Sequence, residues 1–381
     1  MTEKILAVGY SVRHIVCSGC RAGYEMYAAD AFGDVDTRRC ACGYTPLNPF
    51  LLQTEVRRFE RVITDMDGII IGSGLECADF GFLKSCKADR KILGNMPEKM
   101  KEVSDKAWLA VRLDELGILH PVTCTGREVI EEAEIANSLH YPVVAKPAHG
   151  GGGIANFFCE TEKELFRYAK QQPEFLFQEY IKGEHASVST ISARHDTTPV
   201  AVNEQLIGLK SLCSAQGPFV YCGNITPFRT KFYTRMCEIA VFLADELGLI
   251  GSNGVDFVIN DGGPFVIEVN PRFQGSLDTV ELSTGLNMVD ACVKAVRNDL
   301  LPESVVTERH AAKVIAFAKQ DGMVIEKFGR GIVDIPEEGR IIKQGEPIAS
   351  AIGVGDSRAS AVADATGNIE RIKAGVRLFK R

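Results

Sequence analysis

Residues Gly254–Gly275 read GVDFVINDGGPFVIEVNPRFQG, and this stretch decides the fold of the chain. Two runs of β-branched and aromatic residues, Val255–Ile259 and Phe265–Val269, flank a polar turn at Asn260–Pro264. Asp-Gly and Gly-Gly steps between such runs predict a β-hairpin.

Strand alternation gives one face of this hairpin its chemistry. Glu268 and Asn270 are two residues apart and point to one face, and the pairing register can bring Asp256 onto it. Oxygen ligands of this kind suit Mg²⁺ better than zinc. Arg272 follows as a fixed cation for a phosphate or a developing oxyanion. The alternative is a polar hairpin face wetted by solvent.

Composition sets the outer bounds. The chain has 381 residues, enough for two or three domains, with 45% hydrophobic and 24% charged residues. A net charge of −7 gives no global basic field for nucleic acid. No secretory signal or apolar run of membrane-spanning length is evident, so we expect a cytoplasmic protein with no membrane partner. The twelve cysteines are then expected to be reduced.

The first 90 residues alternate strand and helix. Strands are expected at Ile5–Val8 and Tyr24–Ala29, with a helix at Val12–Ala22 between them. This pattern predicts a parallel, doubly wound sheet. An NAD site is disfavoured because the turn Gly9–His14 lacks GxGxxG, although Asp30 sits where a ribose-binding acid would. Further strand material is expected at Val62–Thr64 and Gly68–Gly72.

Four cysteines in this region have spacings that resemble a zinc site, namely Cys17, Cys20, Cys40 and Cys42. Topology argues against the site. The first pair lies late in the first helix and the second pair follows the second strand, so we expect them at opposite ends of the sheet. Ordinary buried or loop thiols are the favoured interpretation.

A second informative stretch is Tyr141–Ile154. A strand carries Lys146 out of an apolar run, and Gly150–Gly153 follow as a loop. Four glycines allow backbone N–H groups to approach phosphate oxygens, and Lys146 supplies a charge for the same phosphates. No Gly-Lys-Ser/Thr opens the next helix, so this is not a P-loop. A plain hairpin turn is the alternative.

Other segments give simpler expectations. We expect helices at Lys106–Leu116 (capped by Ser104-Asp105), Glu128–Leu139, Arg229–Leu247, Asn287–Arg297 and Ala359–Asp364, antiparallel strands at Val188–Ser192 and Val200–Leu206, C-terminal strands at Val314–Ala318, Gly331–Ile335 and Ile369–Ala374, and a turn-rich loop at Tyr221–Pro227.

Taken in order, Lys146, the glycine loop, Gln178–Glu184 and Ile267–Arg272 resemble an ATP-grasp enzyme across Lys106–Asn298. In particular, the chain resembles the prokaryotic carboligases related to biotin carboxylase. The resemblance implies an α/β and α+β ATP-grasp fold in four parts: a pre-ATP-grasp α/β domain at 1–95, an N-terminal subdomain at 96–178, a C-terminal subdomain with the metal site at 179–309, and a β-rich segment at 310–381 that completes the core.

The resemblance also implies roles for single residues. Lys106, Lys146 and Gly150, Gly151, Gly152 and Gly153 correspond to the family's phosphate-binding groups. Glu179 with the Ile181 backbone resembles the adenine hinge, and Glu184 the ribose-binding acid. Asp256, Glu268 and Asn270 match ligands of Mg²⁺, or of Mn²⁺ in its place. Arg272 and Lys146 match the catalytic cations. Family members vary in the first acidic metal ligand, and Asp256 has the shorter of the two acidic side chains. Its part in the coordination is therefore less certain than that of Glu268.

The chemistry implied is ATP-dependent C–N bond formation between a small carboxylate and an amine through an acyl phosphate, releasing ADP and phosphate. Two rivals stay open: a carboxylase-like enzyme that activates bicarbonate, and a nucleotide-binding regulatory protein without turnover. The loops Gln216–Phe228 and Phe273–Asp278, with Ser11 and Arg13, are expected to frame the acceptor site. Arg13 could hold a carboxylate and Asp278 an amine, although such residues are more often on the surface. A homodimer is the candidate assembly.

Overall fold

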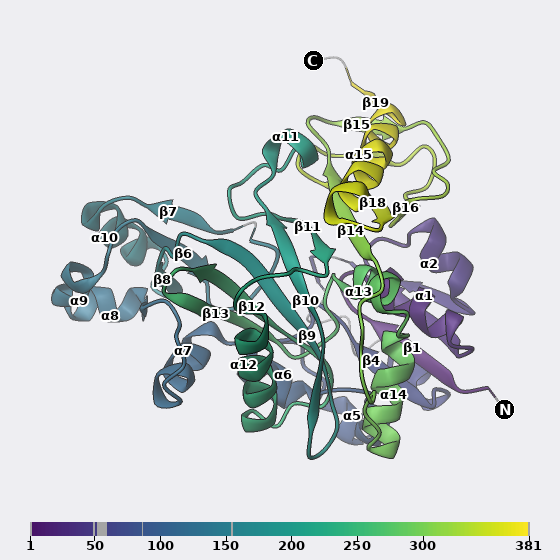
Figure 1. Cartoon of the computed structure of the whole chain (residues 1–381), viewed down its shortest axis with the longest axis horizontal. Helices are drawn as coiled ribbons and strands as arrows, with labels where there is room; N and C mark the ends of the chain where they lie inside the picture. Colours follow the sequence, from purple (N-terminus) through teal and green to yellow (C-terminus); the bar gives the residue numbers. More distant parts are fainter. Residues whose placement is uncertain (1, 49, 52–58, 86, 154, 380–381) are drawn as a thin grey trace.

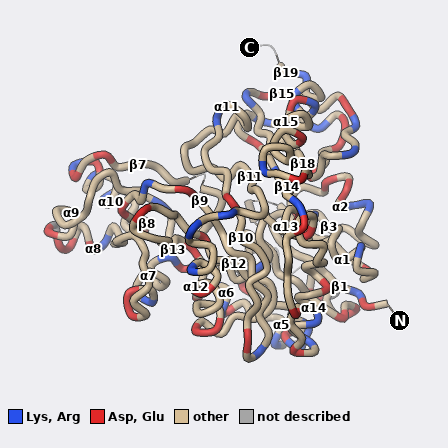
Figure 2. Tube along the Cα trace, in the orientation of Figure 1, with Lys and Arg blue, Asp and Glu red and all other residues tan. Residues whose placement is uncertain are grey.

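The structure is a computed structural model that describes residues 2–48, 50–51, 59–85, 87–153 and 155–379. Its strands form four sheets, which Figure 1 shows with the N-terminal region and the C-terminal helix on one side and a separate small sheet on the other. None of the described helices is both long and apolar enough to cross a bilayer. Acidic and basic residues are interspersed over every part of the trace (Figure 2).

The N-terminal region forms the parallel sheet that the strand–helix alternation predicts. Its strand order is β3-β2-β1-β4, and every pairing is parallel. The order reverses at β1, as in doubly wound sheets, whose ligands bind beyond the strand ends at that point. The elements are β1 (Lys4–Val8), α1 (Arg13–Arg21), β2 (Glu25–Asp30), α2 (Val35–Cys40), β3 (Gly43–Pro46), α4 (Glu60–Thr64), β4 (Gly68–Ile71), α5 (Phe82–Ser85) and a 3₁₀ turn at Asp89–Lys91.

A small antiparallel sheet, ordered β5-β8-β6-β7, follows. Asp105 begins helix α7 by accepting from the backbone N–H groups of Ala107 and Trp108, which satisfies two free donors of the first turn. The elements here are α6 (Pro97–Val103), α7 (Lys106–Glu115), β5 (Thr123–Thr125), α8 (Gly126–Glu131), α9 (Ala133–Ser138), β6 (Val143–Pro147), β7 (Phe157–Cys159), α10 (Glu162–Gln171) and β8 (Phe175–Glu179).

The central eight-stranded sheet is ordered β13-β12-β9-β10-β11-β14-β18-β16. Its strands β14, β18 and β16 come from the last 72 residues, so this segment extends the central sheet. The elements are β9 (Glu184–Ser192), β10 (Thr197–Ile207), α11 (Lys210–Cys213), β11 (Tyr221–Thr226), α12 (Tyr233–Glu246), β12 (Gly251–Asn260), β13 (Gly263–Asn270), α13 (Leu277–Thr284), α14 (Met288–Asn298), β14 (His310–Phe317), β16 (Ile332–Val333), β18 (Pro347–Gly355) and α15 (Arg358–Ala374). The remaining sheet pairs β15 (Gly322–Val324) with β17 (Ile341–Ile342) and β19 (Val376–Leu378).

Several local predictions were wrong. Val62–Thr64 belongs to helix α4. The expected single helix at Glu128–Leu139 divides into α8 and α9 at Glu132.

Two further segments have a different secondary structure from the one that the sequence predicted. Tyr221–Thr226, expected as a loop, is strand β11. Its Gly223 is a packing requirement, because a Cβ there would lie 2.0 Å from the Lys313 carbonyl oxygen of β14. Ile369–Ala374, expected as a strand, continues α15, where Ala361, Ala365, Ile369 and Ile372 are buried at helical spacing. The four-part division of the chain stays a prediction.

Candidate active site

The hairpin β12–β13 brings two carboxylates together. Asp256 pairs directly opposite Glu268 across the antiparallel strands, so both lie on one face, as the alternation predicted. The amide Nδ2 of Asn270 donates to Asp256 Oδ2 at 3.1 Å, and Nε2 of Gln274 lies 3.3 Å from Asp256 Oδ1. Four polar side chains therefore surround a single point on the sheet.

Burial, and then the nearby Glu268 carboxylate, raise the pKa of Asp256 to about 7. Two buried carboxylates side by side favour a bound cation, since it would relieve both effects. The described residues contain no group of three His, Cys, Asp or Glu side chains arranged to hold a metal ion. Two carboxylates and an amide still fit Mg²⁺, which commonly takes one or two protein carboxylates and completes its shell with water and phosphate.

Two buried lysines face this point from the small sheet and α7. Lys106 Nζ donates to the Gly150 carbonyl at 2.7 Å and lies 3.5 Å from Glu268 Oε1. Lys146 Nζ donates to Gln178 Oε1 at 2.7 Å. Burial, and then the charge of Lys106, lower the pKa of Lys146 to about 7. Such a pair suits an anionic ligand, which would restore the charge of Lys146.

The glycine loop has the backbone that only glycine adopts freely. Gly150, Gly152 and Gly153 have φ angles of +115°, +74° and +69°. A Cβ on Gly153 would lie 1.9 Å from the Phe219 carbonyl oxygen. Here the backbone of the loop approaches the 219–221 segment closely, and Tyr221 N–H donates to the Gly152 carbonyl at 3.1 Å.

A cavity of about 250 Å³ lies between the loop and the hairpin. It brings together the predicted residues Gly151, Gly152, Gly153, Asp256, Glu268, Asn270 and Arg272. Lys106, Lys146 and Gly150 border it through the contacts above. The expected adenine-side residues do not line it: Glu179 Oε1 accepts from both the backbone N–H and Nδ1 of His140 at 2.8 Å, Ile181 is half-buried and Glu184 is exposed.

A second cavity of about 210 Å³ meets the first at Tyr221, Arg272 and Gly275. The ends of β1 and β2, the end of β13 and strands β14 and β18 supply its walls, so the N-terminal sheet and the central sheet both contribute. Ser11 lines this cavity, as expected of a residue at the acceptor site.

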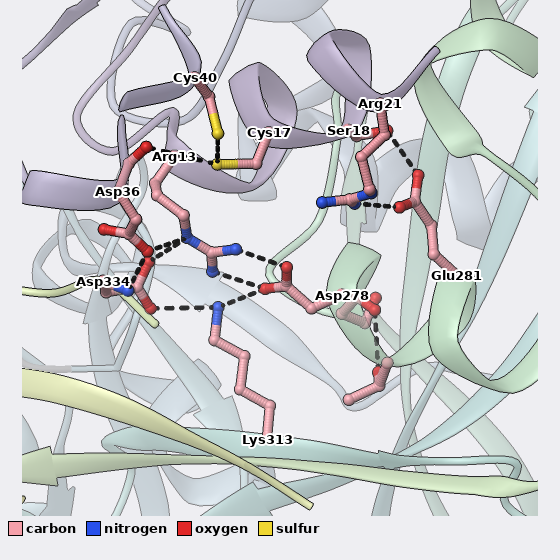
Figure 3. Close-up of polar contacts among 12 residues, drawn as sticks. Arg13, Cys17, Ser18, Arg21, Asp36, Cys40, Asp278, Glu281, Lys313 and Asp334 are labelled. Carbon is pink, nitrogen blue, oxygen red and sulfur yellow. Dashed lines mark hydrogen bonds and ion pairs between the residues drawn. The ribbon is translucent and has the colours of Figure 1, made fainter. Parts of the chain in front are cut away.

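Arg13 and Asp278, expected to hold separate substrate groups, bind each other instead. Nη1 and Nη2 of Arg13 donate to the two Asp278 oxygens at 2.5 and 2.6 Å, and its Nε donates to Asp334 at 2.8 Å. Lys313 Nζ bridges Asp278 and Asp334 at 2.9 and 3.3 Å (Figure 3). Arg13 and Asp278 are buried rather than on the surface, and this pairing argues against an independent substrate role for either.

The cysteine prediction rested on a wrong distance. Cys17 and Cys40 do not lie at opposite ends of the sheet: their sulfurs are 2.8 Å apart (Figure 3), because α2 returns against α1. The hydrogen bond from Cys17 lowers the pKa of Cys40 to about 7. These cysteines are free thiols.

Sequence reasoning missed Glu76, which accepts from Arg272, and Gln205, which bonds to Asp256. Glu76 carries no sequence signal, because 196 positions separate it from its partner. Gln274 and Tyr221 lie in the segments Phe273–Asp278 and Gln216–Phe228, which were expected to frame the acceptor site. Gln274 bonds to Asp256, and Tyr221 joins the two cavities.

Residues 103–276 match the family model of the ATP-grasp domain. This part of the chain is similar to ATP-grasp domains. The matched residues include the lysines, the glycine loop, both carboxylates and Arg272. An uncharacterized protein of Methanocaldococcus jannaschii is 26% identical over 367 residues, covering 92% of this chain and 88% of the relative.

Solved structures share the fold at low identity. The biotin carboxylase domain of Hydrogenobacter thermophilus 2-oxoglutarate carboxylase, solved with MgADP, ADP and bicarbonate, superposes with a TM-score of 0.77 at 18% identity over 98% of this chain and 89% of that one. The L-amino acid ligase from Bacillus licheniformis gives a TM-score of 0.73 at 18% identity over the whole of both chains. The fold is thus shared along nearly the full chain by a biotin carboxylase domain and an L-amino acid ligase.

Proposed function

We propose that this protein is an ATP-dependent carboxylate–amine ligase acting on small molecules. In the proposed reaction a carboxylate attacks the γ-phosphorus of ATP, giving an acyl phosphate and ADP. An amine then displaces phosphate and leaves an amide. The observation that carries the proposal is the pair of adjoining cavities with Arg272 at their junction.

The proposed roles follow from charge and position. Lys106 and Lys146 would neutralise phosphate oxygens of ATP, and Gly150–Gly153 would cover them with backbone N–H groups. Arg272 would contact the transferred phosphoryl group or the tetrahedral adduct. Asp256, Glu268 and Asn270 would hold Mg²⁺, which when bound would neutralise the phosphate charge. Glu179, Ile181 and Glu184 stay the proposed adenine and ribose contacts.

A carboxylase-like reaction on bicarbonate is the second candidate. Its support is the fold shared with a biotin carboxylase domain whose structure holds bicarbonate. The second cavity favours the ligase, because its volume and its aromatic and aliphatic walls suit an organic substrate better than a small hydrated anion.

The test is an ADP-release screen with Mg²⁺-ATP over pooled carboxylates, amino acids and amines, with bicarbonate in a parallel arm. ADP release that needs both a carboxylate and an amine supports the ligase. Release with bicarbonate alone supports the carboxylase. ATP binding without release in any pool, for a folded sample, would favour the regulatory nucleotide-binding protein.

A further inference from the structure

Behind the wall of the second cavity lies a charged cluster with more carboxylates than cations, of which Asp334 and Lys313 line the cavity itself. Arg13 and Lys313 share the same two acids, Asp278 and Asp334, at 2.5–3.3 Å. Asp36 lies a further 3.7 Å from Arg13. Three carboxylates therefore meet two cations in this buried cluster (Figure 3).

Asp34 adds another acid with weak pairing. Its side chain lines the cavity and the residue is only 4% exposed. Its nearest counter-charge is Arg340 Nη1, 3.8 Å from Oδ1, and within the described chain no hydrogen bond is found to its carboxylate. Burial, followed by the charges of Asp334, Asp30 and Asp36, raises the pKa of Asp34 to about 8, which Arg340 offsets only in part.

The cations of the cavity are poorly placed to take a ligand carboxylate. Lys313 is held by two acids, and Arg340 donates to the Phe32 carbonyl at 3.1 Å while its guanidinium lies over the Phe32 ring. Arg272, at the junction, is bonded to Glu76. A positively charged ligand group would favour the ionised form of Asp34 and pair with it, whereas a negative one would find these cations already engaged.

Apolar side chains line another part of the cavity, beside polar residues such as Ser11, His14 and Ser350. Tyr10 and Phe32 form an edge-to-face pair with ring centroids 5.0 Å apart. Strand β14 supplies Ile315, and β18 supplies Ile348 and Ala349, on the lining. A ligand with one ammonium group and a hydrocarbon or aromatic body matches both sides of this cavity.

We propose that the second cavity is the amine-substrate site, where the Asp34 carboxylate pairs with the protonated amine and Tyr10 and Phe32 pack against its apolar body. That the bound amine is a substrate rests on the proposed function. Binding of the amine itself needs neither ATP nor turnover. Because the cavity reaches Arg272, an amine held there adjoins the place where the acyl phosphate would form.

Three probes of similar shape and different charge test the site: 2-phenylethylamine, 2-phenylethanol and 3-phenylpropionate. Their dissociation constants are measured by ligand-observed NMR on the full chain without nucleotide. We expect the amine to bind at least ~10-fold more tightly than the alcohol, the range of a charge-assisted contact, and the acid to bind least.

Variants separate charge from shape. Asp34→Asn should weaken the amine about 10-fold and leave the alcohol unchanged, and Asp34→Glu should restore part of the loss. Tyr10→Ala, at a residue 41% exposed, should weaken all aromatic probes alike. Asp356→Asn removes an exposed acid outside the cavity and should change nothing. If Asp34→Asn fails to fold, the probe affinities of Tyr10→Ala and the pH dependence of amine affinity described below test the proposal instead.

Proton release provides an independent readout. Below pH 8 Asp34 is largely protonated, so an ammonium ligand must displace that proton, and amine affinity should rise roughly 10-fold from pH 6 to pH 7. Calorimetry in phosphate and Tris buffers at pH 7 should show release of about one proton, an effect absent for the alcohol.

Equal binding of amine and alcohol, preferred binding of the acid, or no binding of the amine to folded protein would overturn the proposal. The two hypotheses fail separately. Amine binding through Asp34 without ADP release in any substrate pool contradicts the ligase only. Amine-dependent ADP release whose KM for the amine is unchanged in Asp34→Asn contradicts the Asp34 site only.

Discussion

Glu76 Oε1 accepts a hydrogen bond from Arg272 Nε at 2.6 Å and so ties the N-terminal sheet to the junction of the two cavities. Burial alone would raise the pKa of Glu76, but the charge and hydrogen bond of Arg272 lower it below its ordinary value. The carboxylate uses the Nε edge of the guanidinium, while Nη1 donates to the Phe273 carbonyl at 3.2 Å. Glu76 therefore fixes the plane of Arg272.

Glu76→Gln should lower kcat by roughly 10-fold or more and change the KM for ATP less than about 2-fold. The amide keeps the shape but loses the charged bond that orients Arg272, a geometry used in the transition state rather than in nucleotide binding. Steady-state kinetics of ADP release measure both constants. Glu98→Gln, which removes an exposed acid paired with Lys84, is the matched control. An unchanged kcat would show that Arg272 needs no such support.

Glu268→Gln should lower the rate of ADP release by about 100-fold or more and leave the fold intact. The change removes the carboxylate opposite Asp256 and with it one of the two reasons for the raised pKa of Asp256. The apo variant should therefore melt no lower than the parent. Circular dichroism and a Mg²⁺ titration of activity check the two halves of the expectation, and near-normal activity would contradict the assigned metal role.

Lys146→Met should stabilise the apo protein near pH 7 while weakening ATP binding roughly 10-fold or more. The folded pKa of Lys146 is about 7, below its unfolded value of 10.5, so the buried lysine costs stability below pH 7. That cost is relieved as pH rises from 7 to 10.5, because the unfolded chain there holds a proton that the folded chain lacks.

The methionine variant lacks this pH dependence. Its melting temperature should exceed that of the parent by a few degrees at pH 6 and approach it towards pH 10. Thermal melts across this range and calorimetric titration with ATP measure the two effects. A variant that melts lower at pH 6 would show that the Lys146–Gln178 hydrogen bond outweighs the burial cost.

The sequence predicts the parts of the site that local periodicity controls. Asp256, Glu268 and Asn270 share a face because side chains alternate along strands and a short turn sets the register. The four consecutive glycines Gly150–Gly153 predict a loop, whose positive φ angles at Gly150, Gly152 and Gly153 favour glycine. These features depend on neighbours within about twenty positions, where composition and spacing carry the information.

Long-range contacts follow other rules. Glu76 meets Arg272, and Arg13 meets Asp334, only because three regions of the chain fold against one another. The same reason explains the cysteine error, since the return of α2 against α1 cannot be read from spacing alone. A long-range contact also explains the wrong loop prediction at Gly223. Its glycine is needed because the backbone of β14 lies too close to leave room for a Cβ, and not because the chain turns there.

Arg13→Met should lower the free energy of unfolding by about 3–5 kcal/mol, the cost of leaving buried acids without their partner. The double variant Arg13→Met/Asp278→Leu should recover part of this loss, because it removes one of the stranded charges together with its partner. Urea unfolding of the parent, both single variants and the double variant gives the coupling free energy.

The exposed pair Arg127–Glu174 serves as the control for this double-mutant cycle. Both of its side chains are mostly in solvent, so their coupling free energy should stay below about 1 kcal/mol. Low pH gives a second check. Arg13 and Lys313 hold the pKa of Asp278 well below its usual range, so its contribution to stability is present above about pH 4 and lost as pH falls further. The parent should lose more stability than the double variant on acidification. Additive effects in the Arg13–Asp278 cycle would show that the two residues act independently, despite hydrogen bonds of 2.5 and 2.6 Å between them.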